Sequence, residues 1–222
     1  MNAKNGRFKA IIFDLDGTLL DTLADIAGSM NAVLNSFGFP THPVDSYRYF
    51  TGKGIDGLVR QVLPAGRRDD LTVNEFVSAA KEQYRHRWAD STRPYPGVHE
   101  LLDALETMGL PKAVLSNKAD EFTKLMVASM LPSWSFCDVR GEGPLTPKKP
   151  DPSAALEIAR LMDLVPGQIL YLGDSDTDMQ TAGAAGMYAV GALWGFRDAK
   201  ELLANGAKAL VKTPMEILDL LD

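Results

Sequence analysis

The fold is decided near the start of the chain, by the stretch FKAIIFDLDGT at residues 8–18. Nearly every residue over 8–13 is apolar or β-branched, which is typical of a strand buried on both faces of a sheet. The apolar run stops at Asp14, so the predicted strand ends in carboxylates. Strands buried on both faces belong to parallel sheets, and we therefore expect an α/β fold.

Similar short runs recur downstream, each followed by polar or glycine residues, at 113–115, 168–172, 188–190 and 209–211. Helical periodicity fills the gaps, at 101–108 and 156–162, and residues 174–186 predict a turn leading into an Ala-rich helix. Strands that alternate with helices predict a doubly wound, Rossmann-like parallel sheet. Ligands of such sheets bind outside the carboxyl ends of the strands, so the polar residues there are the candidate site.

Residues 21–93 are too many for a single crossover and carry helical stripes of their own, at 23–37 and 73–84. They predict an inserted, all-helical cap domain. The prolines and the glycine of 93–97 break helical continuation and mark the return to the core. The expected division is a core domain of residues 1–20 and 94–222, with a cap of residues 21–93.

Bulk properties favour a small soluble partner. The 222 residues carry a net charge of −6 with acids and bases interspersed, which indicates neither a nucleic-acid partner nor a membrane surface. Without a signal or membrane-spanning pattern, the chain is expected to be cytoplasmic, as a monomer or homodimer. The single cysteine, Cys137, has apolar neighbours, so we expect a buried thiol in a reducing compartment.

Four polar motifs occur in order along the chain: DLDGT at 14–18, SN at 116–117 and GDSDTD at 173–178 each lie at the end of a predicted strand, and KPDP at 149–152 lies in a predicted loop. In order and spacing they resemble the haloacid dehalogenase superfamily, and the resemblance covers nearly the whole chain. The insertion lies after the first motif, where one major subgroup of that superfamily carries its helical cap. The resemblance implies a magnesium-dependent phosphatase in which Asp14 is the nucleophile.

The chemistry of these residue types agrees with that implication. A carboxylate can attack phosphorus if the charge repulsion is neutralised, and Mg²⁺ prefers oxygen ligands such as those of Asp14 and Asp174. Lys149 supplies a fixed positive charge, while Ser116 and Asn117 are candidates to hold the phosphate oxygens. The resemblance adds the backbone carbonyl of Asp16 as a metal ligand. Asp178 is expected to orient metal-bound water.

Asp16 is then free to act as the general acid toward the leaving group and as the general base for water. Dehalogenases of the superfamily generally lack this second aspartate, so it favours phosphate chemistry. Taken singly, Asp14 or Asp174 would more often be a helix N-cap, as would Asp176, which stays outside the predicted site. Lys148 is the substitute if Lys149 is not the contacting lysine.

Specificity is expected from the cap, where Gly52 and Lys53 of TGKG at 51–54 are candidate substrate contacts and Arg48 is a secondary one. A plain helix-to-helix turn is an equally simple interpretation of this segment. Phosphoglycolate phosphatases of the superfamily carry a similar Gly-x-Gly element, an Asn-Lys pair like 117–118 and a Trp-Gly pair like 194–195. That likeness makes 2-phosphoglycolate the first candidate substrate. A sugar phosphomutase and a phosphate-binding module without turnover remain as alternatives.

Overall fold

A computed structural model describes residues 7–221 of the chain. Residues 1–6 and 222 belong to the predicted core domain but lie outside the described residues. The prediction that the chain has no signal sequence rests in part on residues 1–6. The fold is built on a six-stranded sheet in the order β5-β4-β1-β6-β7-β8, in which all neighbours pair parallel. The strands are β1 Ala10–Phe13, β4 Lys112–Ala119, β5 Asp138–Glu142, β6 Ile169–Gly173, β7 Tyr188–Ala192 and β8 Ala209–Val211.

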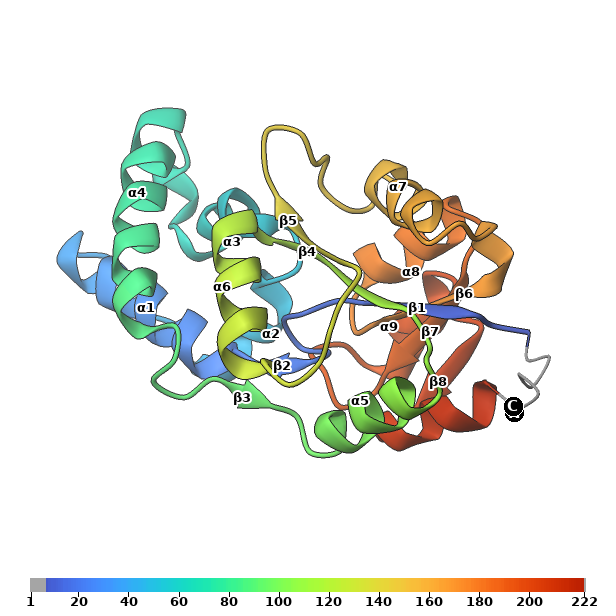
Figure 1. Cartoon of the computed structure of the whole chain (residues 1–222). Helices are drawn as coiled ribbons and strands as arrows, with labels where there is room; N and C mark the ends of the chain where they lie inside the picture. Colours follow the sequence, from blue (N-terminus) through green and yellow to red (C-terminus); the bar gives the residue numbers. More distant parts are fainter. Residues whose placement is uncertain (1–6, 222) are drawn as a thin grey trace.

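Helices cover both faces of the sheet (Figure 1). Ile11 and Phe13 of β1 pack toward α5 Val98–Thr107, α6 Asp120–Met130 and the 3-10 helix η4 Pro214–Leu220. Ala10 and Ile12, which alternate with them, pack toward α7 Ser153–Leu161, α8 Asp176–Ala184 and α9 Ala199–Ala204. A short 3-10 turn, η3 Pro166–Gln168, precedes β6. The predicted doubly wound α/β fold is confirmed.

The central strand β1 marks the point where the strand order reverses. After β1 the chain builds β4 and β5 on one side, and it then returns to build β6, β7 and β8 on the other. Phe13, the last residue of β1, pairs with Val114 of β4 and with Leu172 of β6. The residues that follow these three positions therefore meet at the carboxyl end of the sheet, where ligands of such folds bind.

The predicted strands are all present, but the sheet has one strand more at its edge. The sequence of β5, Asp138-Val-Arg-Gly-Glu, lacks an apolar run because an edge strand pairs on one side only and stays half-exposed. Cys137, which precedes β5, is exposed, so the prediction of a buried thiol was wrong. Its apolar neighbours Trp134 and Phe136 are themselves only half-buried or less, and they leave the cysteine uncovered.

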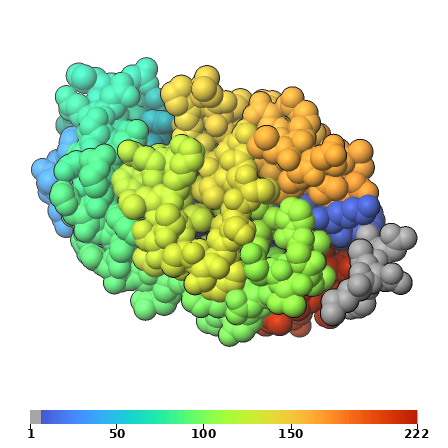
Figure 2. All heavy atoms as spheres, in the orientation of Figure 1, coloured from blue at the N-terminus to red at the C-terminus, as the bar shows by residue number. Residues whose placement is uncertain are grey.

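Between β1 and β4 the chain forms a helical insertion, defined here as residues 22–92, which contains α1 Leu23–Ser36, η1 Val44–Ser46, α2 Tyr47–Phe50, α3 Gly54–Val62, η2 Ala65–Arg67 and α4 Asp70–Arg87. It is flanked by β2 Leu20–Asp21 and β3 Arg93–Pro94, which pair antiparallel. Helices α1 and α4 lie side by side away from the sheet, and the insertion forms one end of the molecule (Figures 1 and 2). The predicted boundaries at 20/21 and 93/94 fall within β2 and β3, and the division into two domains stays a prediction.

The two ends of the helical insertion are joined by a buried carboxylate that the sequence did not single out. Asp25 on α1 accepts hydrogen bonds from the backbone amide of Thr92 at 2.8 Å, from its hydroxyl at 2.8 Å and from the amide of Ser91 at 3.0 Å. Charge-assisted bonds of this kind are stronger than neutral ones. Asp25 therefore fixes where the insertion leaves and rejoins the sheet. None of the helices within residues 7–221 is long and apolar enough to cross a membrane.

Candidate active site

Asp14 lies directly after β1, and its carboxylate faces the end of the sheet. The backbone amide of Asp14 donates to the carbonyl of Leu172, which continues the pairing with β6 for one residue. One carboxylate oxygen accepts from the amide of Leu15 at 2.7 Å and lies 2.9 Å from Nζ of Lys149. Burial, with the nearby charge of Asp178, raises the pKa of Asp14 to about 7 against the opposing effect of Lys149.

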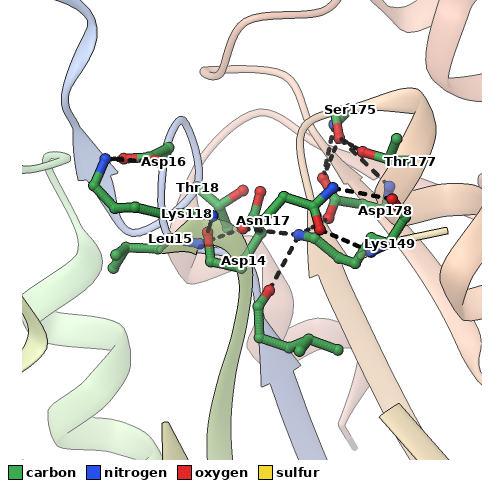
Figure 3. Close-up of polar contacts among 12 residues, drawn as sticks. Asp14, Leu15, Asp16, Thr18, Asn117, Lys118, Lys149, Ser175, Thr177 and Asp178 are labelled. Carbon is green, nitrogen blue, oxygen red and sulfur yellow. Dashed lines mark hydrogen bonds and ion pairs between the residues drawn. The ribbon is translucent and has the colours of Figure 1, made fainter. Parts of the chain in front are cut away.

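Lys149 is the cation at the centre of the site (Figure 3). Its Nζ donates to Asp178 at 2.6 Å and to the carbonyl of Leu115 at 3.1 Å, in addition to its contact with Asp14. All three donors of the ammonium group are thereby used, and its direction is fixed. Lys148, the substitute from the sequence, points elsewhere and pairs with Asp56 at 3.1 Å and Glu142 at 3.0 Å.

Asp178 holds Lys149 from the first turn of α8. Its second oxygen accepts from the amide of Ser175 at 3.0 Å and from the hydroxyl of Ser175 at 2.6 Å. Ser175 is the N-cap of α8 and forms a capping box with Asp178. The N-cap role considered for Asp174 therefore belongs to Ser175. Asp176 is half-exposed in the same turn and lies outside the acidic cluster.

Asp174 follows β6 and is almost completely buried. Its two oxygens accept from the hydroxyl of Thr18 at 3.2 Å and from the amide of Phe196 at 2.7 Å. Two glycines make room for it: a Cβ atom would lie 2.2 Å from Asp174 if built at Gly17 and also if built at Gly195. Gly17 has φ +84°, a backbone region that favours glycine. Glycine at this position therefore allows both the positive φ and the close approach of Asp174.

The carboxylates of Asp14, Asp174 and Asp178 form a buried cluster in which one oxygen from each residue lies within 4.8 Å of the other two. Burial and the other two carboxylates raise the pKa of Asp174 well above its usual range. Lys149 contacts two members of the cluster but not Asp174, so negative charge remains to be balanced. Hard oxygen ligands with excess negative charge suit a divalent cation, and the cluster fits one.

Asn117 connects three segments through its side-chain amide. Its oxygen accepts from the amide of Lys149 at 2.7 Å, and its nitrogen donates to the carbonyls of Lys149 at 3.0 Å and Gly52 at 2.9 Å. Asn117 thus positions the backbone of Lys149 and ties the helical insertion to β4. Ser116 is buried beside it and its hydroxyl accepts from the amide of Lys118 at 3.3 Å.

Asp16 has a partner that the sequence did not predict. Both of its oxygens lie 3.0 Å from Nζ of Lys118, on the other side of Asp14 from Lys149 (Figure 3). The Lys118 ammonium also lies 4.6 Å from the ring centroid of Tyr84 on α4, a cation–π contact that couples the helical insertion to Asp16. The Asn-Lys pair at 117–118 was noticed in the sequence, but nothing in it assigned Lys118 to Asp16.

One pocket brings together the side chains at the strand ends and part of the helical insertion. It is lined by Asp14, Asp16, Ser116, Asn117, Lys149, Asp174 and Gly52, among others. Lys53 is exposed and is not among the lining residues, so of the predicted cap contacts only Gly52 reaches the pocket.

Arg48 donates to the carbonyl of Gly195 at 2.8 Å and so holds the insertion against the loop after β7. Arg197, which the sequence missed, donates to the carbonyls of Arg48 and, at 3.0 Å, of Thr51.

The sequence of the chain matches a known protein family. A family model described as haloacid dehalogenase-like hydrolase matches residues 11–192. The chain belongs to the haloacid dehalogenase-like hydrolase family. The match runs from β1 to β7 and so includes all four motifs, three at strand ends and KPDP in the loop between β5 and α7.

Individual relatives of this haloacid dehalogenase-like hydrolase are phosphatases. A phosphoglycolate phosphatase from Nitrosospira multiformis is 33% identical over 96% of this chain and 95% of its own length. One from Chromobacterium violaceum is 30% identical over 100% of this chain and 99% of its own length. The solved structure of a predicted phosphoglycolate phosphatase from Haemophilus somnus superposes with a TM-score of 0.90 at 26% identity, covering 99% of this chain and all of that one. The chain is thus a hydrolase of the phosphatase type.

Proposed function

We propose that this hydrolase is a magnesium-dependent phosphatase that cleaves a small phosphate monoester through a phosphoryl group carried on Asp14. The observation that supports this most is the contact of Lys149 with Asp14 beside two further buried carboxylates. Such an arrangement points one carboxylate at a substrate and keeps cations beside it to neutralise the repulsion with phosphate. The phosphatase names of the relatives agree with the proposal.

The reaction takes two steps. In the first, a carboxylate oxygen of Asp14 forms a bond to phosphorus, the ester P–O bond breaks, and Asp16 gives a proton to the departing oxygen. In the second, Asp16 takes a proton from a water molecule whose oxygen attacks the phosphorus, and the bond between phosphorus and Asp14 breaks. The sum is ester plus water to alcohol plus phosphate, with both aspartates restored.

Other residues of the pocket bind and orient. Lys149 holds the attacking carboxylate in place, and the Ser116 hydroxyl with nearby backbone amides offers donors to the phosphate oxygens. Mg²⁺ would be held by Asp14, Asp174 and the backbone carbonyl of Asp16, with Asp178 behind them, and it supplies positive charge against the phosphate. In this proposal residues 21–93 act as a cap that excludes water and contacts the leaving group.

The first candidate substrate is 2-phosphoglycolate, because relatives that match over nearly their whole length are named phosphoglycolate phosphatases. Phosphate release from 2-phosphoglycolate with and without Mg²⁺ tests the proposal. We expect release that depends on Mg²⁺ and falls at least about a thousandfold in Asp14→Asn, since the nucleophile is lost. Undiminished release by that variant would contradict the proposal. A requirement for a sugar bisphosphate would indicate a phosphomutase instead.

A further inference from the structure

The pocket that begins at Asp14 continues between the helices of the insertion, and there its lining changes character. The insertion side is formed by Ile26 and Met30 of α1, Ile55 and Leu58 of α3, and by Phe122 of α6, which packs against them. The ring of Phe122 meets that of Tyr84 edge-on, with centroids 5.2 Å apart. The lining of the pocket therefore extends beyond the strand ends to α1, α3 and α6.

One charged side chain of the helical insertion also lines this pocket. Lys81 on α4 is half-buried and lines the pocket one helical turn before Tyr84. The other cations of the lining are paired: Lys118 with Asp16, Lys149 with Asp14 and Asp178, and Arg197 with Glu201. Among residues 7–221, no carboxylate oxygen lies within 4.0 Å of the Lys81 ammonium. A partly buried ammonium without a partner gains most from an anionic ligand.

We infer that the pocket takes phosphate monoesters of ω-hydroxy carboxylic acids, whose apolar chain lies against α1, α3 and Phe122 while the terminal carboxylate pairs with Lys81. This rests on the proposed function and deepens it, because 2-phosphoglycolate is the shortest member of the class. The phosphate stays at Asp14, and the chain length decides whether the carboxylate reaches Lys81.

The apolar part of the lining also argues against sugar phosphates as the preferred class. A sugar presents several hydroxyl groups, and each needs a hydrogen-bond partner when it leaves water. Ile26, Met30, Ile55, Leu58 and Phe122 offer no such partner. A methylene chain makes no hydrogen bonds with water that it would lose against these side chains, and its burial is favourable.

A chain-length series tests the inference. The substrates are ω-carboxyalkyl phosphates with two, four and six carbons, each matched with an alkyl phosphate of equal length that lacks the carboxylate. We expect kcat/KM to rise about fourfold for each methylene that becomes buried. Lys81→Gln should lower kcat/KM about tenfold for the six-carbon acid and leave the alkyl phosphates within twofold. Lys81→Arg should restore part of the loss.

The matched control is Lys124→Gln on α6, because Lys124 is exposed and pairs with Asp120 at 2.7 Å, outside the pocket lining. It should change none of these values. An equal loss for acids and alkyl phosphates in Lys81→Gln, or no loss at all, would overturn the inference while leaving the phosphatase proposal intact.

Measuring ligand affinity tests the inference independently of catalytic turnover. Calorimetry on Asp14→Asn, with and without Lys81→Gln added, gives the affinity for the six-carbon acid and for its alkyl match. A preference for the acid of about tenfold that disappears with Lys81→Gln supports the inference even if no ester is hydrolysed, in which case only the proposed function fails. Equal affinities for the two ligands overturn it.

Discussion

The ammonium of Lys118 lies 3.0 Å from each carboxylate oxygen of Asp16 and 4.6 Å from the ring centroid of Tyr84. The three residues come from the motif after β1, from β4 and from α4 of the helical insertion. Through Lys118, the proposed acid–base residue is thus held by both the sheet and the insertion. The position of the insertion and the position of Asp16 are therefore linked.

Replacing Lys118 with Met should impair the step in which Asp16 gives up a proton. We expect kcat to fall about tenfold to a hundredfold for an alkyl phosphate, whose leaving oxygen needs that proton. For p-nitrophenyl phosphate, whose leaving group departs without one, the fall should stay within about threefold. Lys118→Arg should recover part of the activity. An equal fall for both substrates would show that Lys118 acts by structure alone.

Adding a single methyl group at Gly195 should disable the site although no charged residue is replaced. Its Cβ would lie 2.2 Å from the Cβ of Asp174 and 2.5 Å from the carbonyl oxygen of Gly17, so Asp174 must move. Gly195→Ala should lower activity at least about a hundredfold and destabilise the fold by about 1–3 kcal/mol, as overpacking does. Thermal unfolding and initial rates measure the two effects.

The matched change is Gly183→Ala in α8, where a Cβ meets nothing within 4 Å. It should keep full activity and raise the free energy of unfolding by about 0.5–1 kcal/mol, because alanine favours a helix over glycine. If Gly195→Ala were as harmless as Gly183→Ala, the tight packing around Asp174 would not matter for function.

Mg²⁺ should raise the unfolding temperature of the protein, because a cation that binds the folded state alone stabilises it. Asp174→Asn should abolish most of this rise, since the carboxylate belongs to the buried cluster. Asp176→Asn, two residues away and outside that cluster, should leave it unchanged. Equal responses of the two variants in differential scanning fluorimetry would argue against a metal at Asp174.

Stability without divalent cations should depend on pH through Asp14. Its pKa rises from 3.8 in the unfolded chain to about 7 in the folded one, so the folded state binds the proton more tightly. The stability contributed by the neutral form is therefore fully present below about pH 4 and lost as the pH rises to about 7. The loss is on the order of 4 kcal/mol at most, since one pKa unit corresponds to about 1.4 kcal/mol.

Urea unfolding of the protein and of Asp14→Asn across pH 4–8 isolates this effect, because the other carboxylates are common to both. The variant should gain stability relative to the parent as the pH rises, and Mg²⁺ should reduce that gain. A difference that stays constant with pH would contradict the raised pKa of Asp14.

The sequence predicted the sheet, the insertion and the residues at the strand ends because each leaves a local signal. Residues 8–13 form an almost continuous apolar run, and the motifs beginning at Asp14 and Gly173 lie at the ends of strands that pair directly in the sheet. Contacts made across the fold leave no such signal. The pairing of Lys118 with Asp16 spans 102 positions, and that of Arg197 with the carbonyl of Thr51 spans 146.

Local patterns in the sequence also do not show whether a side chain is exposed or whether a polar segment forms an edge strand. Lys53 lies between Gly52 and Gly54 and its side chain is exposed at the start of α3, so its contact with substrate stays a prediction. The edge strand β5 is too polar to resemble a buried strand, and it was missed with the exposure of Cys137 beside it. In each case the exposure of the segment depends on how it packs against neighbouring elements.

The most direct test of the account is chemical trapping of the phosphoryl group on Asp14. The protein is mixed with substrate and Mg²⁺, quenched within milliseconds and reduced with borohydride, which converts an acyl phosphate of aspartate to homoserine. Peptide mass spectrometry should then find homoserine at position 14, with Asp16 unchanged, and none in Asp14→Asn. Phosphate release by a protein in which position 14 is never converted, or conversion at another aspartate, would contradict the assignment of Asp14 as the nucleophile.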